Sequence, residues 1–270
     1  MDIQTLFSVN SKVALITGGG SGIGLMIATG FVKNGAKVYI TSRKTKVLER
    51  VAAELTQMGP GQCVALACDL QSYEQTKELA AEVQRREPQG IHVLINNSGA
   101  TWGENDIESY PDQAWTKLLT LNVQRVFTLT QLLIPSLAKA AAACGSASVI
   151  NIGSIDGLKV PMLITPAYAA SKAAVHHLTH VLAANLGSRD ITVNAIAPGP
   201  FQSHMMKATL ESMQDVIASR IPVKRIGSPE DMAATCIFLA SRGGAYVNGA
   251  VIPVDGGSII GNQQYTLPNL

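Results

Sequence analysis

The chain has 270 residues, of which 47% are hydrophobic and 15% charged, and its formal net charge is +2. This composition excludes a disordered chain, and the length suits one large α/β domain over residues 1–270. The charges do not form a block of Lys and Arg, so we expect a small-molecule partner, with no nucleic acid and no membrane.

Short apolar runs alternate with amphipathic stretches along the whole chain. Residues 12–17 form the first run, and apolar positions then recur at helical spacing over residues 23–34. Strands that are apolar throughout, separated by helices, indicate a parallel sheet covered on both faces. The predicted fold class is α/β, a single Rossmann-type doubly wound parallel sheet of about seven strands. Strands are expected at 12–17, 38–41, 63–67, 92–96, 148–153, 192–197 and 250–254, and helices at 23–34, 46–58, 73–87, 111–143, 166–187 and 229–240.

Residues 198–225 interrupt this alternation between the last two strands. A short helix within this stretch is expected to form a lid over the substrate.

A glycine-rich segment, Thr17-Gly-Gly-Gly-Ser-Gly-Ile-Gly24, joins the first strand to the first helix. Gly18 and Gly22 allow a tight turn and close approach of a pyrophosphate, while Gly24 allows the helix to pack on the sheet. The helix N-terminus adds partial positive charge. An ordinary turn is the alternative, which the strand–loop–helix context disfavours. The residues expected to bind a dinucleotide here are Gly18, Gly20, Ser21, Gly22, Ile23 and Gly24.

The end of the second strand predicts which dinucleotide binds. It reads Thr41-Ser42-Arg43-Lys44 and has no carboxylate to bind a ribose 2′-hydroxyl. Arg43 can pair with a 2′-phosphate through two hydrogen bonds, and Ser42 adds a hydroxyl donor. The predicted cofactor is therefore NADP(H); the alternative is that Arg43 and Lys44 only start a solvated helix.

A tyrosine and a lysine four residues apart indicate a proton-handling centre. Tyr168 and Lys172 share one helical face, and an ammonium beside the phenol is expected to lower the tyrosine pKa from about 10. Ser154 follows the fifth strand, at the sheet edge where open α/β folds bind ligands. Asn122 lies within a helix although its amide has little helical advantage.

The T-G-x-x-x-G-x-G spacing, with these later motifs in the same order, resembles the short-chain dehydrogenase/reductase family, in its β-ketoacyl-reductase-like branch. The resemblance covers residues 12 to about 257. It implies that Tyr168 is the general acid in reduction and the base in oxidation, and that Ser154 holds the substrate oxygen. It also implies that Lys172 binds the nicotinamide ribose and that Asn122 anchors a proton-relay water. Further cofactor contacts implied by it are Asp69, Leu70, Asn97, Gly99, Pro198, Gly199 and Ser203, with Ser98 and Ser203 in place of the family's usual Ala and Thr.

The function implied by the resemblance is NADPH-dependent reduction of a ketone, 3-oxoacyl or secondary-metabolite in type, to a secondary alcohol. An NADP-dependent alcohol dehydrogenase working in the oxidative direction and a non-catalytic NADP(H)-binding regulator are the alternatives. A homodimer or homotetramer is expected. The residues expected to contact substrate are Trp102, Ile155, Met205 and Met206.

Other chemistries and locations fit less well. His176, His177 and His180 would suit a metal only with an interleaved glutamate, which is absent, and no metal is predicted. Ser154 lacks the G-x-S-x-G elbow of a serine hydrolase. The start of the chain lacks a signal peptide pattern, no 18-residue run is wholly apolar, and the cysteines lack CxxC spacing. These features favour the cytoplasm; the ending at residues 268–270 leaves the peroxisome as an alternative.

Overall fold

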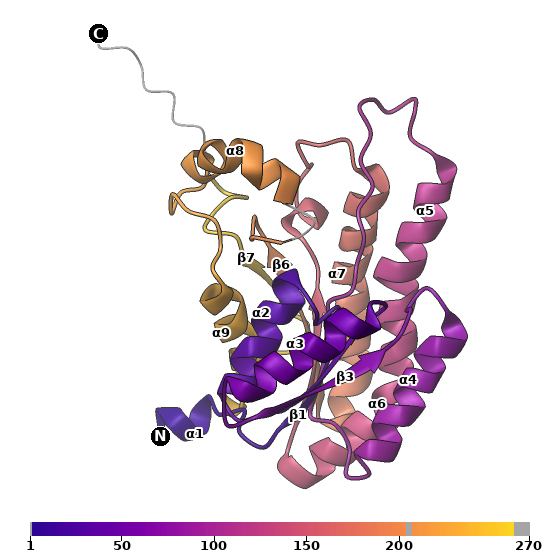
Figure 1. Cartoon of the computed structure of the whole chain (residues 1–270), viewed down its shortest axis with the longest axis vertical. Helices are drawn as coiled ribbons and strands as arrows, with labels where there is room; N and C mark the ends of the chain where they lie inside the picture. The colour runs from indigo at the N-terminus through magenta and orange to yellow at the C-terminus, as the bar shows by residue number, and fades with distance from the viewer. Residues whose placement is uncertain (1, 204–206, 262–270) are drawn as a thin grey trace.

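Seven parallel strands form the centre of the protein. The computed structural model describes residues 2–203 and 207–261, with the strand order β3-β2-β1-β4-β5-β6-β7 (Figure 1). The fold class and the predicted strand number are confirmed. The strands are β1 (Val13–Thr17), β2 (Lys37–Ser42), β3 (Gln62–Ala67), β4 (Val93–Asn96), β5 (Ala147–Ile152), β6 (Ile191–Pro198) and β7 (Val251–Val254).

Helices cover both faces of this sheet, because successive strand side chains point to opposite sides. Ile16 packs with Phe31 on one face, whereas Leu15 packs with Leu133 on the other. Burying each of these side chains stabilises the fold by about 1.5–3 kcal/mol. The first face carries α2 (Gly22–Lys33), α3 (Thr45–Gln57) and α9 (Pro229–Ala240); the second carries α4 (Tyr73–Arg86), α6 (Arg125–Cys144) and α7 (Pro166–Leu186). Figure 1 shows α2 and α9 on the left and α6 and α7 on the right.

The strand order reverses between β1 and β4. Chain connections leave these two neighbours in opposite directions across the sheet, so a crevice opens at their carboxyl ends. The glycine segment follows β1 and Asn97 follows β4, so both lie at this crevice.

The helix predicted over residues 111–143 is not a single α-helix. It consists of α5 (Asp112–Leu119), a π-helical turn η1 (Thr120–Gln124) and α6. π-Helical turns occur often at functional sites, and this one contains Asn122.

The whole helical run 112–144 is long and apolar enough to cross a membrane by length and composition alone. Half of its most apolar window is buried within the protein, and α6 packs against α4 and β5. A core helix meets the same criteria, and the packing is that of a core helix.

Two short helices lie outside the strand–helix alternation. α1 (Ile3–Leu6) was not predicted; the Asp2 carboxylate accepts hydrogen bonds from Gln4 N and Thr5 N and starts it. A helix within residues 198–225 was predicted, and α8 (Lys207–Arg220) lies there, at the top of Figure 1 above β6 and β7. Its role as a lid remains a prediction, and Met205 and Met206 lie outside the described residues.

Candidate active site

The glycine segment forms a cradle at the start of α2. Gly18 and Gly22 have φ values of +67° and +52°, which residues other than glycine rarely adopt. A Cβ on Gly24 would collide with the Gly18 carbonyl oxygen. Ser21 is the N-cap of α2 but makes no side-chain cap hydrogen bond, so the first amides of the helix remain free to meet a phosphate.

Thr17, which sequence reasoning did not single out, ties this cradle to β4. Its hydroxyl accepts hydrogen bonds from Asn97 N and Ser98 N, both at 2.9 Å, and its carbonyl accepts one from Asn97 Nδ2 at 2.7 Å. The side chain of Asn97 therefore positions the glycine segment. A threonine immediately before the glycines was the available sequence signal.

The predicted residues of the adenosine end follow β2 and β3, which are hydrogen-bonded neighbours. A Cβ on Gly20 would lie 3.6 Å from Ser42 Oγ, so the glycine segment reaches the end of β2. Arg43 is exposed directly after Ser42. Asp69 is half-buried after β3, its carboxylate accepting from Gln71 N at 3.0 Å, and Leu70 is buried.

Three predicted catalytic side chains converge at the carboxyl end of β5. Ser154 Oγ accepts a hydrogen bond from Asp156 N at 3.1 Å, which leaves its own hydrogen to donate. The Tyr168 phenol interacts with Ser154 through a hydrogen bond. Lys172 Nζ lies 5.6 Å from the centroid of the Tyr168 ring and donates to Ile152 O at 2.8 Å.

The pKa of Tyr168 differs from the sequence expectation. Burial raises it to about 12, the hydrogen bond with Ser154 opposes that change, and the Asp156 charge adds to it. The expectation of a tyrosine pKa below about 10 is therefore wrong for the protein alone, because desolvation of the phenolate dominates. Burial also lowers the pKa of Lys172 to about 8. Tyr168 thus holds its proton at neutral pH, as a general acid requires.

Asn122 joins two parts of the site through its side-chain amide. Oδ1 accepts from Ala100 N, and Nδ2 donates to both Ala100 O and Ser171 Oγ, each at 2.9 Å. A Cβ on Gly99 would lie 3.3 Å from Asn122 Oδ1 and 3.5 Å from Lys172 Nζ. The amide therefore holds the segment after β4 against α7. Its predicted part in a water relay remains a prediction.

The segment after β6 returns to the glycine cradle. Gly199 N donates to Val254 O at 2.9 Å, and a Cβ there would come within 2.8 Å of Asp255 Cα. A Cβ on Gly22 would lie 3.1 Å from Ser203 Cβ. Pro198 ends β6. Ser203 is thus brought beside the start of α2, while Gly199 packs against the end of β7.

Comparison with known proteins agrees with this arrangement. Residues 18–258 match the family model described as enoyl-(acyl carrier protein) reductase. A rhamnolipid-biosynthesis 3-oxoacyl-[acyl-carrier-protein] reductase from Pseudomonas aeruginosa is 42% identical over 253 residues, covering 93% of this chain and 97% of that protein. The chain belongs to the short-chain dehydrogenase/reductase family.

Two further comparisons also cover nearly the whole chain. Galactitol 2-dehydrogenase from Cereibacter sphaeroides is 33% identical over 261 residues, covering 95% of this chain and 98% of that protein. The structure titled as the Pseudomonas aeruginosa RhlG/NADP active-site complex has a TM-score of 0.90 and 40% identity, covering 95% of this chain and 99% of that chain. The predicted family and the predicted oxidoreductase class are confirmed.

The histidines considered for a metal do not gather in this short-chain oxidoreductase. His176 is buried, and its ring fills the space beside Gly153 and Gly157, where a Cβ on Gly153 would collide with it. His177 and His180 are exposed, with ring centroids 6.1 Å apart. Within residues 2–203 and 207–261, no three His, Cys, Asp or Glu side chains form a group that could hold a metal ion.

Burial, with a smaller effect from Lys172, lowers the pKa of His176 to about 4. This imidazole is therefore neutral at physiological pH and packs against Gly153 and Gly157.

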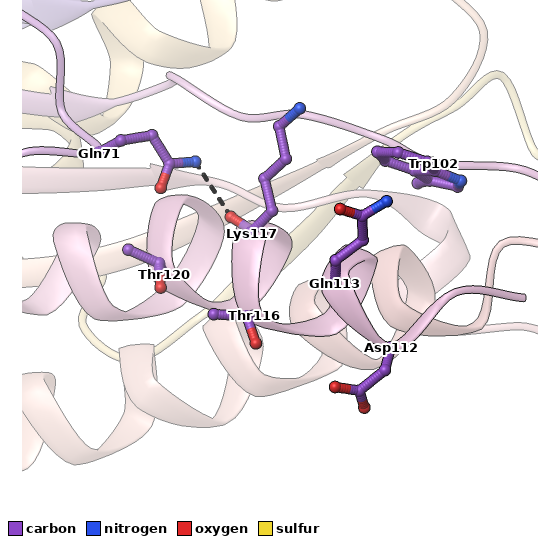
Figure 2. A pocket seen from close by; sticks show the side chains of 7 residues that line it. All are labelled: Gln71, Trp102, Asp112, Gln113, Thr116, Lys117 and Thr120. Atoms are coloured by element: carbon purple, nitrogen blue, oxygen red, sulfur yellow. Dashed lines mark hydrogen bonds between the residues drawn. The ribbon is translucent and has the colours of Figure 1, made fainter.

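The two described residues predicted to contact substrate lie in different places. Ile155 is buried in the turn directly after Ser154. Trp102 lines a surface cavity of about 560 Å³ along α5 (Figure 2). Its ring lies under Lys117 Nζ at 5.4 Å, and its Nε1 donates to Glu104 Oε1 at 2.8 Å. Gln71 donates to Lys117 O at 3.1 Å at the same cavity, whose other lining residues are Asp112, Gln113, Thr116 and Thr120.

Proposed function

We propose that this short-chain oxidoreductase reduces a ketone of the 3-oxoacyl type to a secondary alcohol, with NADPH as hydride donor. The observation that carries the proposal is the meeting of Ser154, Tyr168 and Lys172 at the carboxyl end of β5, beside the glycine cradle. A proton donor and a dinucleotide cradle at one sheet edge are the two parts that carbonyl reduction needs.

The residues at the crevice fit NADP(H). The backbone of Gly18 and Gly22, with the α2 N-terminus, would hold the pyrophosphate. Arg43 and Ser42 would hold the 2′-phosphate, at a strand end that has no competing carboxylate. The related structure that is titled as an NADP complex supports the same cofactor. When bound, NADPH supplies the hydride.

The protein's own groups would manage the proton and the substrate oxygen. Ser154 would donate its hydroxyl hydrogen to the carbonyl oxygen, while Asp156 N donates to one of the two lone pairs on the same Oγ. Tyr168 would then give its proton to the same oxygen as negative charge develops there. Lys172 is held by Ile152 O within reach of the ring and would stabilise the phenolate left behind.

Exposed apolar side chains in the segment between Ser154 and Tyr168 support an acyl-type substrate. Val160, Met162 and Leu163 follow Ser154 in the chain and are 90%, 81% and 64% exposed. An exposed apolar stretch next to a reaction centre suits an apolar ligand. The relative named for rhamnolipid biosynthesis as a 3-oxoacyl-[acyl-carrier-protein] reductase supports the same class.

The direction of reaction is part of the proposal. Burial raises the pKa of Tyr168 to about 12, so the phenol is protonated at neutral pH, as the proton donor of the proposed reduction must be. The regulator alternative is disfavoured because all the proton-handling groups are present.

A spectrophotometric assay tests the function. NADPH absorbance is followed with 3-oxodecanoyl-N-acetylcysteamine, a soluble 3-oxoacyl thioester, with NADH and with the matched 3-hydroxy thioester plus NADP+ as controls. We expect NADPH to be consumed with the ketone, and more slowly with NADH. Turnover confined to other ketones would remove the acyl assignment, and no ketone turnover despite NADPH binding would favour the regulator.

We also infer a homodimer or homotetramer in the cytoplasm. Phe127 on α6 and Val181 on α7 are exposed apolar side chains on long helices, suited to a symmetric contact. Analytical ultracentrifugation should give a molecular mass two or four times the 28.4 kDa of one chain. A single 28.4 kDa species would contradict the oligomer. Four free cysteines support a reducing compartment, and the bacterial relatives give no support to the peroxisome.

A further inference from the structure

Asp156 lies next to the reaction centre but has no part in the proton handling described above. It is the central residue of the 3₁₀ turn η2 (Ile155–Gly157), which begins at Ser154. Its backbone N–H donates to Ser154 Oγ at 3.1 Å. A Cβ on Gly157 would lie 2.7 Å from the Lys172 carbonyl carbon, so the turn rests directly on α7. Asp156 is thereby fixed between the two elements that carry the catalytic hydroxyls.

The side-chain carboxylate of Asp156 is half-buried and accepts no hydrogen bond from the part of the chain that the structure describes. A carboxylate partly removed from water without a donor is costly, so its presence calls for a function. Its charge contributes to the raised pKa of the Tyr168 phenol, after the larger effect of burial.

One cation, Lys159, acts on this carboxylate through its charge. Lys159 is exposed, however, and its Nζ donates to Ser258 O at 3.1 Å. Lys172 is buried one turn after Tyr168, and its Nζ donates to Ile152 O. Neither lysine forms an ion pair with Asp156 within the described residues. The turn that begins at Ser154 therefore carries a half-buried carboxylate that forms no ion pair within the described residues.

We propose that Asp156 is a specificity-determining residue that rejects ketones carrying a carboxylate near the reacting carbonyl and admits neutral ketones such as esters and thioesters. This inference rests on the proposed carbonyl reduction. Two like charges repel more strongly in a partly buried site than in water, so an anionic substrate is penalised both in binding and in the transition state. A relative from Escherichia coli is named 5-keto-D-gluconate 5-reductase, and the sugar acid in that name belongs to the class of anionic ketones that this chain should reject.

Acetoacetate and ethyl acetoacetate form a matched pair of probes. Both carry the same 3-oxo group, and they differ in one full charge beside it. Reduction of either by NADPH gives the 3-hydroxy product and NADP+, with the proton supplied through Tyr168. The ratio of kcat/KM for the ester to that for the anion measures the discrimination, at fixed ionic strength and pH 7.5.

Asp156→Asn removes the charge and retains the shape. We expect the variant to raise kcat/KM for acetoacetate by about tenfold, which corresponds to about 1.4 kcal/mol. The kcat/KM for ethyl acetoacetate should change by less than about twofold. Asp190→Asn is the control: it makes the same change of charge at the amino end of β6, away from the site, in a left-handed conformation that asparagine tolerates. It should leave the ratio unchanged.

Two results would overturn the inference. One is an unchanged ratio of the two kcat/KM values in Asp156→Asn. The other is an equal decrease in kcat/KM for both probes, which would mean that Asp156 only supports Ser154. Binding of both probes to the NADP+ complex, followed by saturation-transfer NMR, separates this inference from the proposed function. Suppose that the wild type binds the ester better than the anion, that Asp156→Asn loses this preference, and that neither ketone is turned over. This result would contradict the proposed reductase and retain the specificity role of Asp156.

Discussion

Replacing Tyr168 with phenylalanine is expected to lower kcat by about 10²–10⁴-fold, the usual contribution of a positioned general acid. Phenylalanine fills the same space and removes only the hydroxyl that faces Ser154. Lys172 keeps its hydrogen bond to Ile152 O, so the cofactor side of the site should be unchanged. Single-turnover kinetics and NADPH fluorescence titration measure the two effects, and the Kd for NADPH should change less than about twofold.

Tyr110→Phe is the matched control for that variant. The Tyr110 hydroxyl donates to Trp102 O at 3.2 Å, so its loss removes one tyrosine hydroxyl outside the proton-handling group. Its kcat should stay close to the wild-type value. Normal turnover by Tyr168→Phe would reject the acid assignment, and a parallel loss in both variants would indicate a general effect on folding.

The second large effect is expected at the end of β2. Arg43→Ala should raise the Kd for NADPH by about 10–100-fold, because a charge-assisted hydrogen bond contributes about 1.5–3 kcal/mol. The Kd for NADH should barely change, since NADH lacks the 2′-phosphate. Isothermal titration with both cofactors gives the comparison directly.

Arg50→Ala controls for the loss of one positive charge. Arg50 lies on α3, is exposed and pairs with Glu54 at 3.4 Å, away from the glycine cradle. The Arg50→Ala variant should bind both cofactors with the same Kd as the wild type. If Arg43→Ala weakens the binding of NADH as much as that of NADPH, the assignment of Arg43 to the 2′-phosphate is wrong.

The sheet was predictable from sequence because its strands are short apolar runs bounded by glycine or polar residues. Expected and observed strand ends differ by at most about one residue; β5, for instance, was expected over 148–153 and spans Ala147–Ile152. The catalytic residues were predictable because their order and spacing resemble the motifs of the short-chain dehydrogenase/reductase family. Parallel pairing then brings the ends of β1, β4 and β5 to one edge.

Features set by long-range contacts could not be predicted in this way. The π-helical turn contains Asn122, whose amide bonds Ala100 and Ser171, residues distant in sequence. Burial is the largest effect on the pKa of Tyr168 and raises it, and helical spacing in the sequence does not report burial. Trp102 lines a cavity on α5 because of contacts with Glu104 and Lys117, and not because of its place after Gly99. Asp156 is a single carboxylate and forms no pattern at all.

The most direct test of the central claim follows the hydride itself. NADPH deuterated at the transferring C4 position is mixed with enzyme and a 3-oxoacyl thioester, and the product is analysed by mass spectrometry. The account predicts a 3-hydroxy product with one deuterium on the new carbinol carbon, and far less of that product with Tyr168→Phe. A product without the label, or the same amount of labelled product from both proteins, would contradict it.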